Sequence, residues 1–216
     1  MIRFIRKTPK SILLLISIFY FVFILPLIKN TGVAGLTGLT ELMNTIAYSL
    51  ILFSIFSIID NKTKFLRYLI ILAVSLIWMM YYSEHVVFEY IAFIFSTIVF
   101  VITTGIMIKQ IVSSKTVSAK VIVETISGYL LIGVIFGFLN SILFWVDPNS
   151  IGLGGKNGIS NIMYYSFITV TTIGYGDISP ISQAAKSLSI LFGIISQLYL
   201  TIIMALIIGK FLNEKK

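Results

Sequence analysis

The segment Thr172-Ile173-Gly174-Tyr175-Gly176-Asp177 lies in a short polar dip between two long apolar runs. Glycine takes positive φ angles at little steric cost. Gly174 and Gly176 therefore allow successive carbonyls of an irregular strand to turn toward one axis, instead of alternating as along a β-strand. Four such segments, one from each of four chains, would close rings of oxygen atoms around a dehydrated cation. The segment predicts a carbonyl-lined cation filter.

Neighbouring side chains have predicted parts in this filter. Thr172 adds a hydroxyl oxygen at the inner end, Tyr175 places its ring behind the backbone, and Asp177 holds negative charge at the outer mouth. The alternative is an ordinary glycine-rich turn of a soluble protein. Irregular backbone at membrane depth is tolerated only where it lines a cavity or lies buried in protein, and the flanking sequence places this loop at a membrane. We therefore favour the filter.

The composition is that of a polytopic membrane protein. Of the 216 residues 58% are hydrophobic and 11% are charged, and the mean hydropathy is +1.04. The absence of cysteine excludes disulfides, thiolate zinc sites and thiol nucleophiles. With a single histidine as well, the chain lacks the usual groups of an intramembrane hydrolase, so we predict no enzyme activity. The net charge of +8 is spread in a way that argues against a nucleic-acid partner.

Six apolar runs are each long enough to cross about 30 Å of hydrocarbon. They cover residues 11–28, 42–59, 65–82, 86–108, 117–146 and 187–208. The first run has the position of a signal peptide, but its length and the absence of a small-residue cleavage site favour a retained helix. We therefore predict an all-α membrane protein with six transmembrane helices, and a re-entrant pore helix and filter loop between helices 5 and 6.

The basic residues predict how these helices are oriented. Thirteen of the sixteen lie at the two ends of the chain and in the second and fourth loops. They are Arg3, Arg6, Lys7, Lys10, Lys62, Lys64, Arg67, Lys109, Lys115, Lys120, Lys210, Lys215 and Lys216. The positive-inside rule then places both termini in the cytoplasm of a multi-pass protein of the cell membrane, and residues 147–183 outside. A filter that re-enters from the external face should begin there.

Turn-forming residues divide this external loop. Asp147-Pro148-Asn149 ends the fifth helix, and four glycines between residues 152 and 158 form a flexible stretch. Ser160 or Asn161 should then cap a short helix that runs through Thr171. The C-terminal end of its dipole would point into the membrane and favour a cation there.

The segment from Tyr164 to Pro180 resembles the pore loop of the potassium channel superfamily. With its flanking helices the resemblance covers residues 117–211. The outer helix carries Gly128-Tyr129-Leu130-Leu131 and the inner helix carries Gln197-Leu198-Tyr199-Leu200, and both are most similar to small prokaryotic channels with one pore loop per subunit. The resemblance implies a homotetramer in the lipid bilayer with K⁺ in its filter. The implied ion-binding residues are Thr172, Ile173, Gly174, Tyr175 and Gly176, the first four through their backbone oxygens.

The resemblance also implies roles at both ends of the pore. Ser179, two positions after Asp177, should ring the external vestibule together with that carboxylate. The implied cavity and gating residues on the inner helix are Gly193, Ser196, Gln197, Leu200 and Met204. Gly193 is a candidate flexing point, but related inner helices often carry their hinge glycine about one turn later, where this chain has Ser196. The position of the bend is left open.

Residues 1–112 hold four helices, and residues 113–216 hold the predicted pore domain. The four helices resemble a voltage sensor in number and placement only. Moving one charge through 100 mV supplies only about 2.3 kcal/mol, so a sensor needs several Arg or Lys in its fourth helix. Residues 86–108 contain neither. We therefore expect a membrane scaffold, and a channel that is not steeply voltage-gated.

Two smaller features of the fifth helix leave alternatives open. Glu124 either faces another helix or pairs with Lys120, with ordinary snorkelling at the interface as the simplest interpretation. Gly133 and Gly137 form a small-xxx-small pair, which suits close packing of the inner helix or of a neighbouring subunit. Loose helix packing is an equally good interpretation of the two glycines.

A cluster of Glu84, His85 and Glu89 lies at the start of the fourth helix. A carboxylate beside an imidazole would suit a proton sensor, because histidine titrates near physiological pH. An ordinary interfacial turn is the favoured interpretation.

Eight residues follow Ile208, so we expect no cytosolic nucleotide- or Ca²⁺-sensing domain in this chain, and no cofactor besides the permeant K⁺. A K⁺ transporter component is one alternative, although such transporters carry four degenerate pore loops in one long chain. A non-conducting regulatory membrane subunit is the other.

Overall fold

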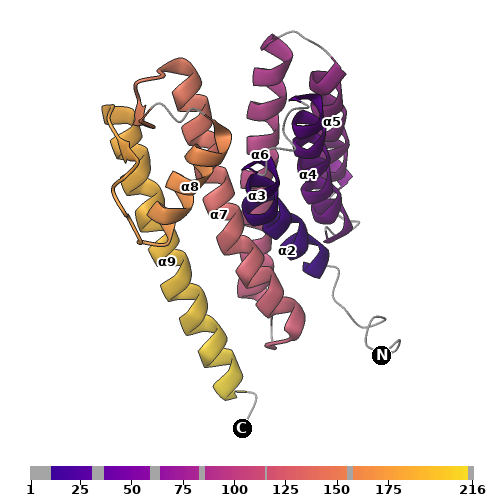
Figure 1. Cartoon of the computed structure of the whole chain (residues 1–216). Helices are drawn as coiled ribbons and strands as arrows, with labels where there is room; N and C mark the ends of the chain where they lie inside the picture. Colours follow the sequence, from indigo (N-terminus) through magenta and orange to yellow (C-terminus); the bar gives the residue numbers. More distant parts are fainter. Residues whose placement is uncertain are drawn as a thin grey trace. The chain divides into compact units, whose positions relative to one another are not determined.

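The computed structural model describes residues 11–30, 37–58, 64–82, 86–114, 116–154 and 158–213. Within these ranges six segments are long and apolar enough to cross a membrane, which confirms the six predicted spans (Figure 1). Glu84 and His85 lie outside the described residues, and so do eight of the thirteen basic residues that predict the orientation.

The first span changes its helical pitch partway along. Helix α2 (Ser11–Phe19) passes into the π-helix η1 (Tyr20–Ile24) and then into α3 (Leu25–Asn30). The backbone N–H of Leu25 reaches the carbonyl of Tyr20, five residues back. Pro26 follows directly, and proline lacks an N–H and clashes with the carbonyl four residues earlier. A wider turn before Pro26 gives the proline ring more room beside the preceding turn.

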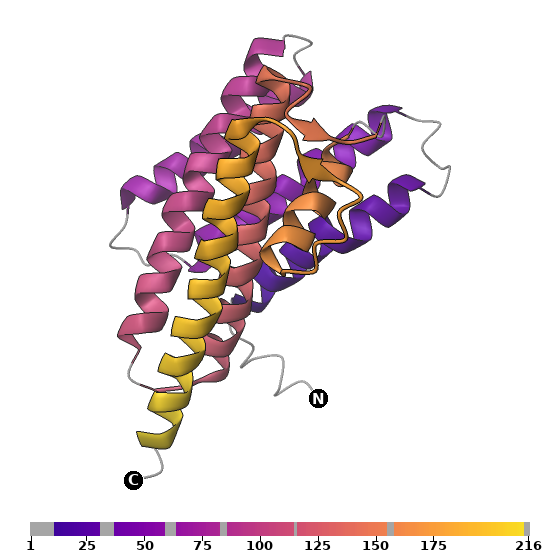
Figure 2. The same ribbon diagram turned by 90° about the vertical axis from the view of Figure 1, so that its left-hand side faces the viewer.

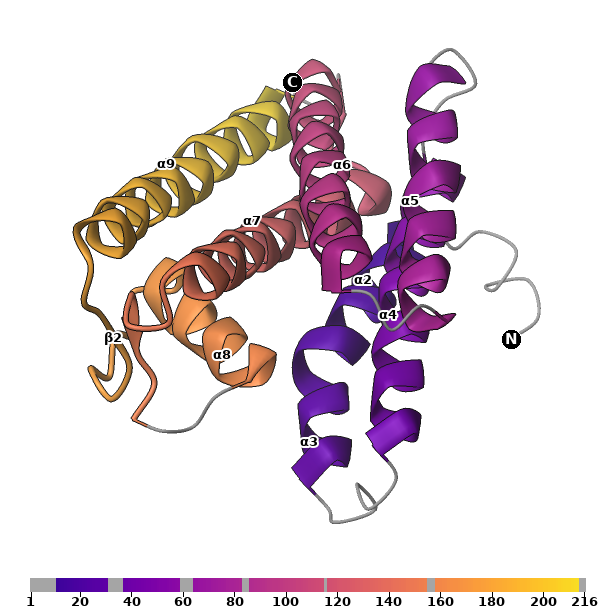
Figure 3. The ribbon, with the colours of Figure 1, turned by 90° about the horizontal axis from the view of Figure 1, so that it is seen from above.

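The next helices are α4 (Thr37–Ile58), α5 (Lys64–Tyr82) and α6 (Val86–Ser113). Together with α2 and α3, helices α4 and α5 belong to a first compact unit, which comprises residues up to 103 and residues 118–127 (Figure 3). A second unit comprises residues 104–117 and those from 128 onward. The functional boundary predicted between residues 112 and 113 stays a prediction.

The first unit has an apolar interior with a few polar contacts between its helices. Fully buried side chains of α2 and α4 meet there: Leu14, Ile18, Ile51, Leu52 and Ile55. The Ser17 and Ser54 hydroxyls lie 3.0 Å apart, and the Trp78 indole donates to Ser49 Oγ at 3.1 Å. These bonds connect α2 to α4 and α5 to α4.

The second unit contains the end of α6 from residue 104, the remaining helices and a two-stranded sheet. Its other elements are α7 (Ala119–Val146, shared with the first unit), β1 (Ile151–Gly152), α8 (Ile159–Val170), β2 (Ser179–Pro180) and α9 (Gln183–Asn213). Strands β1 and β2 pair antiparallel, with Ile151 opposite Pro180 and Gly152 opposite Ser179 (Figure 2). Helix α7 ends at Val146, as the Asp147-Pro148-Asn149 turn predicts.

Two expectations about α8 are corrected. Its N-cap residue is Gly158, at φ 151° and without a side-chain cap, and neither Ser160 nor Asn161 has that role. The glycines Gly133 and Gly137 of α7 pack against α8, whereas the prediction named the inner helix or another subunit.

The contacts of these two glycines are close. A Cβ atom at Gly133 would lie 2.7 Å from the ring of Phe167, and one at Gly137 would collide with the sulfur of Met163. The lack of side chains at both positions therefore brings α8 against the middle of α7.

Candidate functional site

The C-terminal end of α8 leads directly into the candidate loop, and its last four carbonyls all accept hydrogen bonds. These carbonyls would otherwise lack helical partners. The bonds are Thr171 N to Phe167 O at 3.0 Å, Gly174 N to Ile168 O at 3.0 Å, Thr172 N to Thr169 O at 3.0 Å, and Tyr129 Oη to Val170 O at 2.9 Å. Thr172 and Gly174 are loop residues, so the helix end and the loop form one connected structure.

The backbone of the loop takes a positive φ at every second residue. The angles are 62° at Thr172, 53° at Gly174 and 81° at Gly176, which confirms the conformation expected of the two glycines. A Cβ added at either glycine would meet nothing within 4 Å, so backbone conformation and not crowding restricts these positions in the isolated chain. Thr172 is β-branched, and a positive φ is uncommon and strained for such a residue.

The side chains of the loop are exposed within the single chain. Ile173 is 54% exposed and Tyr175 is 73% exposed, and Thr172, Gly174 and Gly176 are exposed as well. The ring of Tyr175 therefore does not pack behind the backbone of its own chain. Asp177 is also exposed and accepts a hydrogen bond from the hydroxyl of Tyr164 at 3.1 Å.

The exit of the loop is fixed by the small sheet. Ser179 lies in β2, opposite Gly152, and is exposed. The carbonyl of Ser150 accepts hydrogen bonds from Ile181 N at 2.8 Å and Ser182 N at 3.1 Å. Ser182 Oγ in turn accepts a bond from Ala185 N at 3.1 Å and caps the start of α9.

Polar and aromatic contacts join α8 to both neighbouring helices. Asn140 of α7 donates to Ser166 Oγ at 3.2 Å, and the Tyr165 and Ser189 hydroxyls connect α8 to α9 at 2.5 Å. The buried ring of Phe136 lies 5.9 Å from that of Tyr165 and 4.9 Å from that of Phe192. Contacts with α7 and α9 thus fix α8, the helix from which the loop continues.

The residues expected on the inner helix lie on two sides of α9. Gln197, Leu200 and Met204 are exposed, as residues facing a cavity or a neighbouring subunit would be in an isolated chain. Ser196 is fully buried, and its hydroxyl donates to the carbonyl of Gly193 at 2.9 Å. The helix continues through Gly193 without a break. The gating roles of these residues stay predictions.

Two contacts of this unit were not predicted from the sequence. Tyr129 had no predicted role beyond its place in a segment similar to other channels. In the structure its hydroxyl donates to the carbonyl of Val170, at the end of α8. Lys210, near the end of α9, donates to the carbonyls of Ile111 and Val112, each at 2.9 Å, and to Ser114 Oγ at 3.2 Å. Its ammonium group caps the C-terminus of α6, where a positive charge is favourable.

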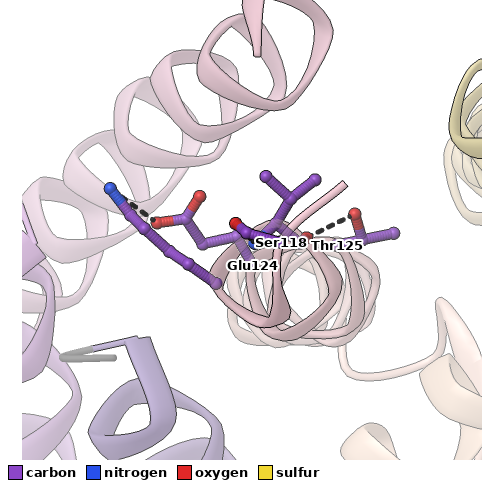
Figure 4. Close-up of polar contacts among 5 residues, drawn as sticks. Ser118, Glu124 and Thr125 are labelled. Carbon is purple, nitrogen blue, oxygen red and sulfur yellow. Dashed lines mark hydrogen bonds and ion pairs between the residues drawn. The ribbon is translucent and has the colours of Figure 1, made fainter. Parts of the chain in front are cut away.

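Glu124 pairs with Lys120, one of the two alternatives predicted for it (Figure 4). The lysine Nζ lies 3.7 Å from Glu124 Oε1. The lysine side chain is 59% exposed and the glutamate side chain only 3%. The long lysine stem therefore brings its charge to a buried carboxylate while it remains open to solvent. Figure 4 also shows Ser118 and Thr125, whose hydroxyls bond the backbone of Val121.

Comparison with known proteins identifies the part of the chain that contains the loop. Residues 124–213 match a family described as ion channels. The chain is also 28% identical over 72 residues to two-pore potassium channel 2 of Arabidopsis thaliana. Residues 124–213, which include the candidate loop, are therefore similar to ion channels, and part of the chain is similar to a potassium channel. No solved structure gives a significant match.

The channel match covers most of α7, then α8, the loop and α9. It leaves helices α2 to α6 outside. The alignment with the plant potassium channel covers 33% of this chain and 16% of the length of that relative. The helices support a multi-pass membrane protein, and residues 124–213 are similar to an ion channel family. Channel activity, the permeant ion, the assembly and the gating are proposed below.

Proposed function

We propose that the chain is one subunit of a K⁺-selective channel, in which four copies surround a single pore for passive K⁺ flux. Residues 172–176 form the selectivity filter, and backbone oxygens of Thr172, Ile173, Gly174 and Tyr175 bind the ion. The observation that carries this proposal is the positive φ at every second residue of the loop. A run of residues whose φ alternates in sign has the irregular backbone that a carbonyl-lined filter needs.

The end of α8 supports a cation site. A helix C-terminus carries about half a negative elementary charge. The last carbonyls of α8 are fixed by hydrogen bonds, so this partial charge is held in one place next to Thr172. Four such ends around one axis would stabilise a K⁺ ion in the cavity below the filter. Asp177, held by Tyr164, adds negative charge at the other end of the loop.

Exposure within the single chain supports assembly with further copies. Ile173 and Tyr175 are large apolar side chains that the chain itself leaves open. On α9 the exposed apolar residues include Ile194, Leu198, Ile202 and Met204. In a tetramer the neighbouring subunits, the lipid and the central cavity would take up these surfaces. The first four helices would then act as a membrane scaffold, with both termini in the cytoplasm.

Ion flux from purified protein in liposomes tests the proposal. K⁺-loaded vesicles containing the channel should release K⁺ when a proton carrier balances the charge, and Na⁺-loaded vesicles should release far less. Gly174→Ala is the inactive reference, and Gly105→Ala, at an open position of helix α6, is the matched control that should conduct normally.

Four results would contradict the proposal. Equal K⁺ and Na⁺ release removes the selectivity, and flux that survives Gly174→Ala removes the filter. An oligomer of native size that passes no ions supports the regulatory-subunit alternative, whereas K⁺ movement only with a second chain supports a transporter component.

A further inference from the structure

Tyr129 of α7 is in contact with both α8 and α9. Its hydroxyl donates to the carbonyl of Val170 at 2.9 Å, and its ring stacks on that of Tyr199. The two ring centroids are 6.2 Å apart and their planes differ by 28°. Val170 is fully buried and Tyr199 is 6% exposed, so both contacts lie inside the unit.

The bond to Val170 differs in origin from the others at the end of α8. The carbonyls of Phe167, Ile168 and Thr169 are bonded by residues of the loop itself. The carbonyl of Val170 is bonded by a residue 41 positions earlier in the chain. Local bonds move together with the loop, whereas a bond from another helix fixes the loop relative to the rest of the unit.

This bond lies close to a residue with a strained backbone. Two residues after Val170 comes Thr172, a β-branched residue at φ 62°. Such a conformation persists only when its surroundings hold it. In the proposed channel this residue forms the innermost ion site, so a small displacement of Val170 acts directly on the filter.

The ring of Tyr129 is held by Tyr199 of α9. A Cβ atom at Gly128 would lie 2.5 Å from the hydroxyl oxygen of Tyr199 and 3.3 Å from Cζ, so Tyr199 fits only because residue 128 is glycine. Tyr199 is buried on one side of α9, while Gln197 and Leu200 are on its exposed side. A movement of α9 therefore moves the ring against which Tyr129 stacks.

We propose that Tyr129 is a positioning residue for the filter, and that its stack with Tyr199 couples the position of α9 to the innermost ion site. The inference rests on the proposed function. It adds a route by which the inner helix changes ion selection without touching the ion: α9 displaces Tyr199, Tyr199 displaces Tyr129, and Tyr129 displaces the carbonyl that precedes the filter.

The test is the K⁺/Na⁺ permeability ratio of full-length variants in planar bilayers, taken from reversal potentials under bi-ionic conditions. Tyr129→Phe deletes the bond to Val170 and keeps the stacked ring. We expect the ratio to fall about two- to tenfold, the range that the loss of one hydrogen bond implies. Tyr165→Phe is the matched control, because it deletes another tyrosine hydroxyl bond of α8, to Ser189, away from the helix end. It should leave the ratio unchanged.

A second variant tests the coupling to α9. Tyr199→Leu removes the stacked ring and leaves the Tyr129 hydroxyl in place, and we expect the ratio to fall in the same direction. Because the two tyrosines act as one link, the double variant should lose less than the two single losses combined.

The possible outcomes separate this inference from the proposed function. Wild-type protein without selective K⁺ flux overturns both. If wild-type flux is selective and Tyr129→Phe has the same K⁺/Na⁺ permeability ratio as Tyr165→Phe, Tyr129 has a purely structural role. That result overturns the inference and leaves the proposed function standing. A normal ratio in Tyr199→Leu overturns the coupling, and this variant also decides the matter if Tyr129→Phe fails to assemble.

Discussion

The two compact units of this protein use polar side chains in different ways. In both units serine and threonine hydroxyls mostly return to the carbonyl four residues earlier in their own helix, in the second unit for example at Ser141 and Thr201. The first unit shows this bond at many positions. Examples are Ser17, Thr45, Ser49, Ser54, Ser96, Thr97 and Thr103. The first unit also has the two bonds between helices described above. What distinguishes the second unit is that its bonds between elements gather around α8 and the loop after it. These bonds link Tyr129 with Val170, Asn140 with Ser166, Tyr164 with Asp177, and Tyr165 with Ser189.

The difference indicates where accurate placement matters. Lipid tails are as apolar as leucine, so burial of apolar side chains gives membrane helices little preference for one mutual orientation. A hydrogen bond constrains both distance and angle. The helices of the first unit have to span the membrane, whereas the second unit has to hold one short loop in a strained conformation.

The largest effect should follow substitutions in the loop. Gly174→Ala and Gly176→Ala each place a Cβ on a residue with positive φ, at 53° and 81°, without any steric collision in the chain. We expect loss of K⁺ conduction, or of its preference over Na⁺, with near-normal expression. Flux measurements in liposomes and size-exclusion profiles decide this. Unchanged K⁺/Na⁺ permeability in both variants would remove the filter assignment.

A smaller effect should follow crowding between α7 and α8. Gly133→Ala forces the new methyl group against the rigid ring of Phe167, and overpacking of this kind costs about 1–3 kcal/mol. Gly105→Ala adds the same atom where nothing lies within 4 Å, and should be neutral or stabilising by at most about 1 kcal/mol. Thermal unfolding in detergent compares the two. Equal melting temperatures would mean that α8 does not pack against Gly133.

A still smaller effect is expected in the first unit. Ser54→Ala removes the 3.0 Å contact with Ser17, and such interhelical bonds in membrane proteins average about 0.6 kcal/mol. The melting temperature should fall slightly and the K⁺/Na⁺ permeability ratio should stay at the wild-type value. A change in this ratio would show that the first unit also positions the filter.

The smallest effect concerns voltage. With no basic residue between positions 86 and 108, the open probability should vary only shallowly between about −100 and +100 mV. Patch recordings of reconstituted protein measure this directly. An activation curve as steep as several gating charges per subunit would contradict the scaffold role of the first four helices, unless the field acts on ions within the filter.

Much of this architecture could be predicted from the sequence, because its signals are local. Hydropathy indicates the six spans, the Asp147-Pro148-Asn149 turn ends α7, and glycine chemistry predicts the φ angles at Gly174 and Gly176. Each of these properties is set by a few consecutive residues.

The predictions that were wrong or missing concern which residues or helices contact one another. The pair Gly133 and Gly137 indicates a helix face that another helix can approach closely. It does not indicate which helix does so, and in the structure this helix is α8. The N-cap prediction favoured a side-chain oxygen, whereas Gly158 leads into α8 with φ 151°, a conformation that L residues rarely adopt. The bond from Tyr129 to Val170 spans 41 positions, and helical periodicity does not predict such a pairing. Gly128, next to Tyr129, is the one feature of the sequence that could have indicated a close contact at this point of α7.

The contact of Lys210 with the end of α6 is the last of several contacts spaced along α9. Helix α9 has 31 residues, which at 1.5 Å each gives a length of about 46 Å. Tyr199 lies about 24 Å from the Gln183 end and about 16 Å from Lys210 by the same rise per residue. Ser189 and Phe192, which contact Tyr165 and Phe136, lie on the Gln183 side of Tyr199. Release of Lys210 from α6 would therefore free about 16 Å of the helix beyond Tyr199, while the half before it stays held.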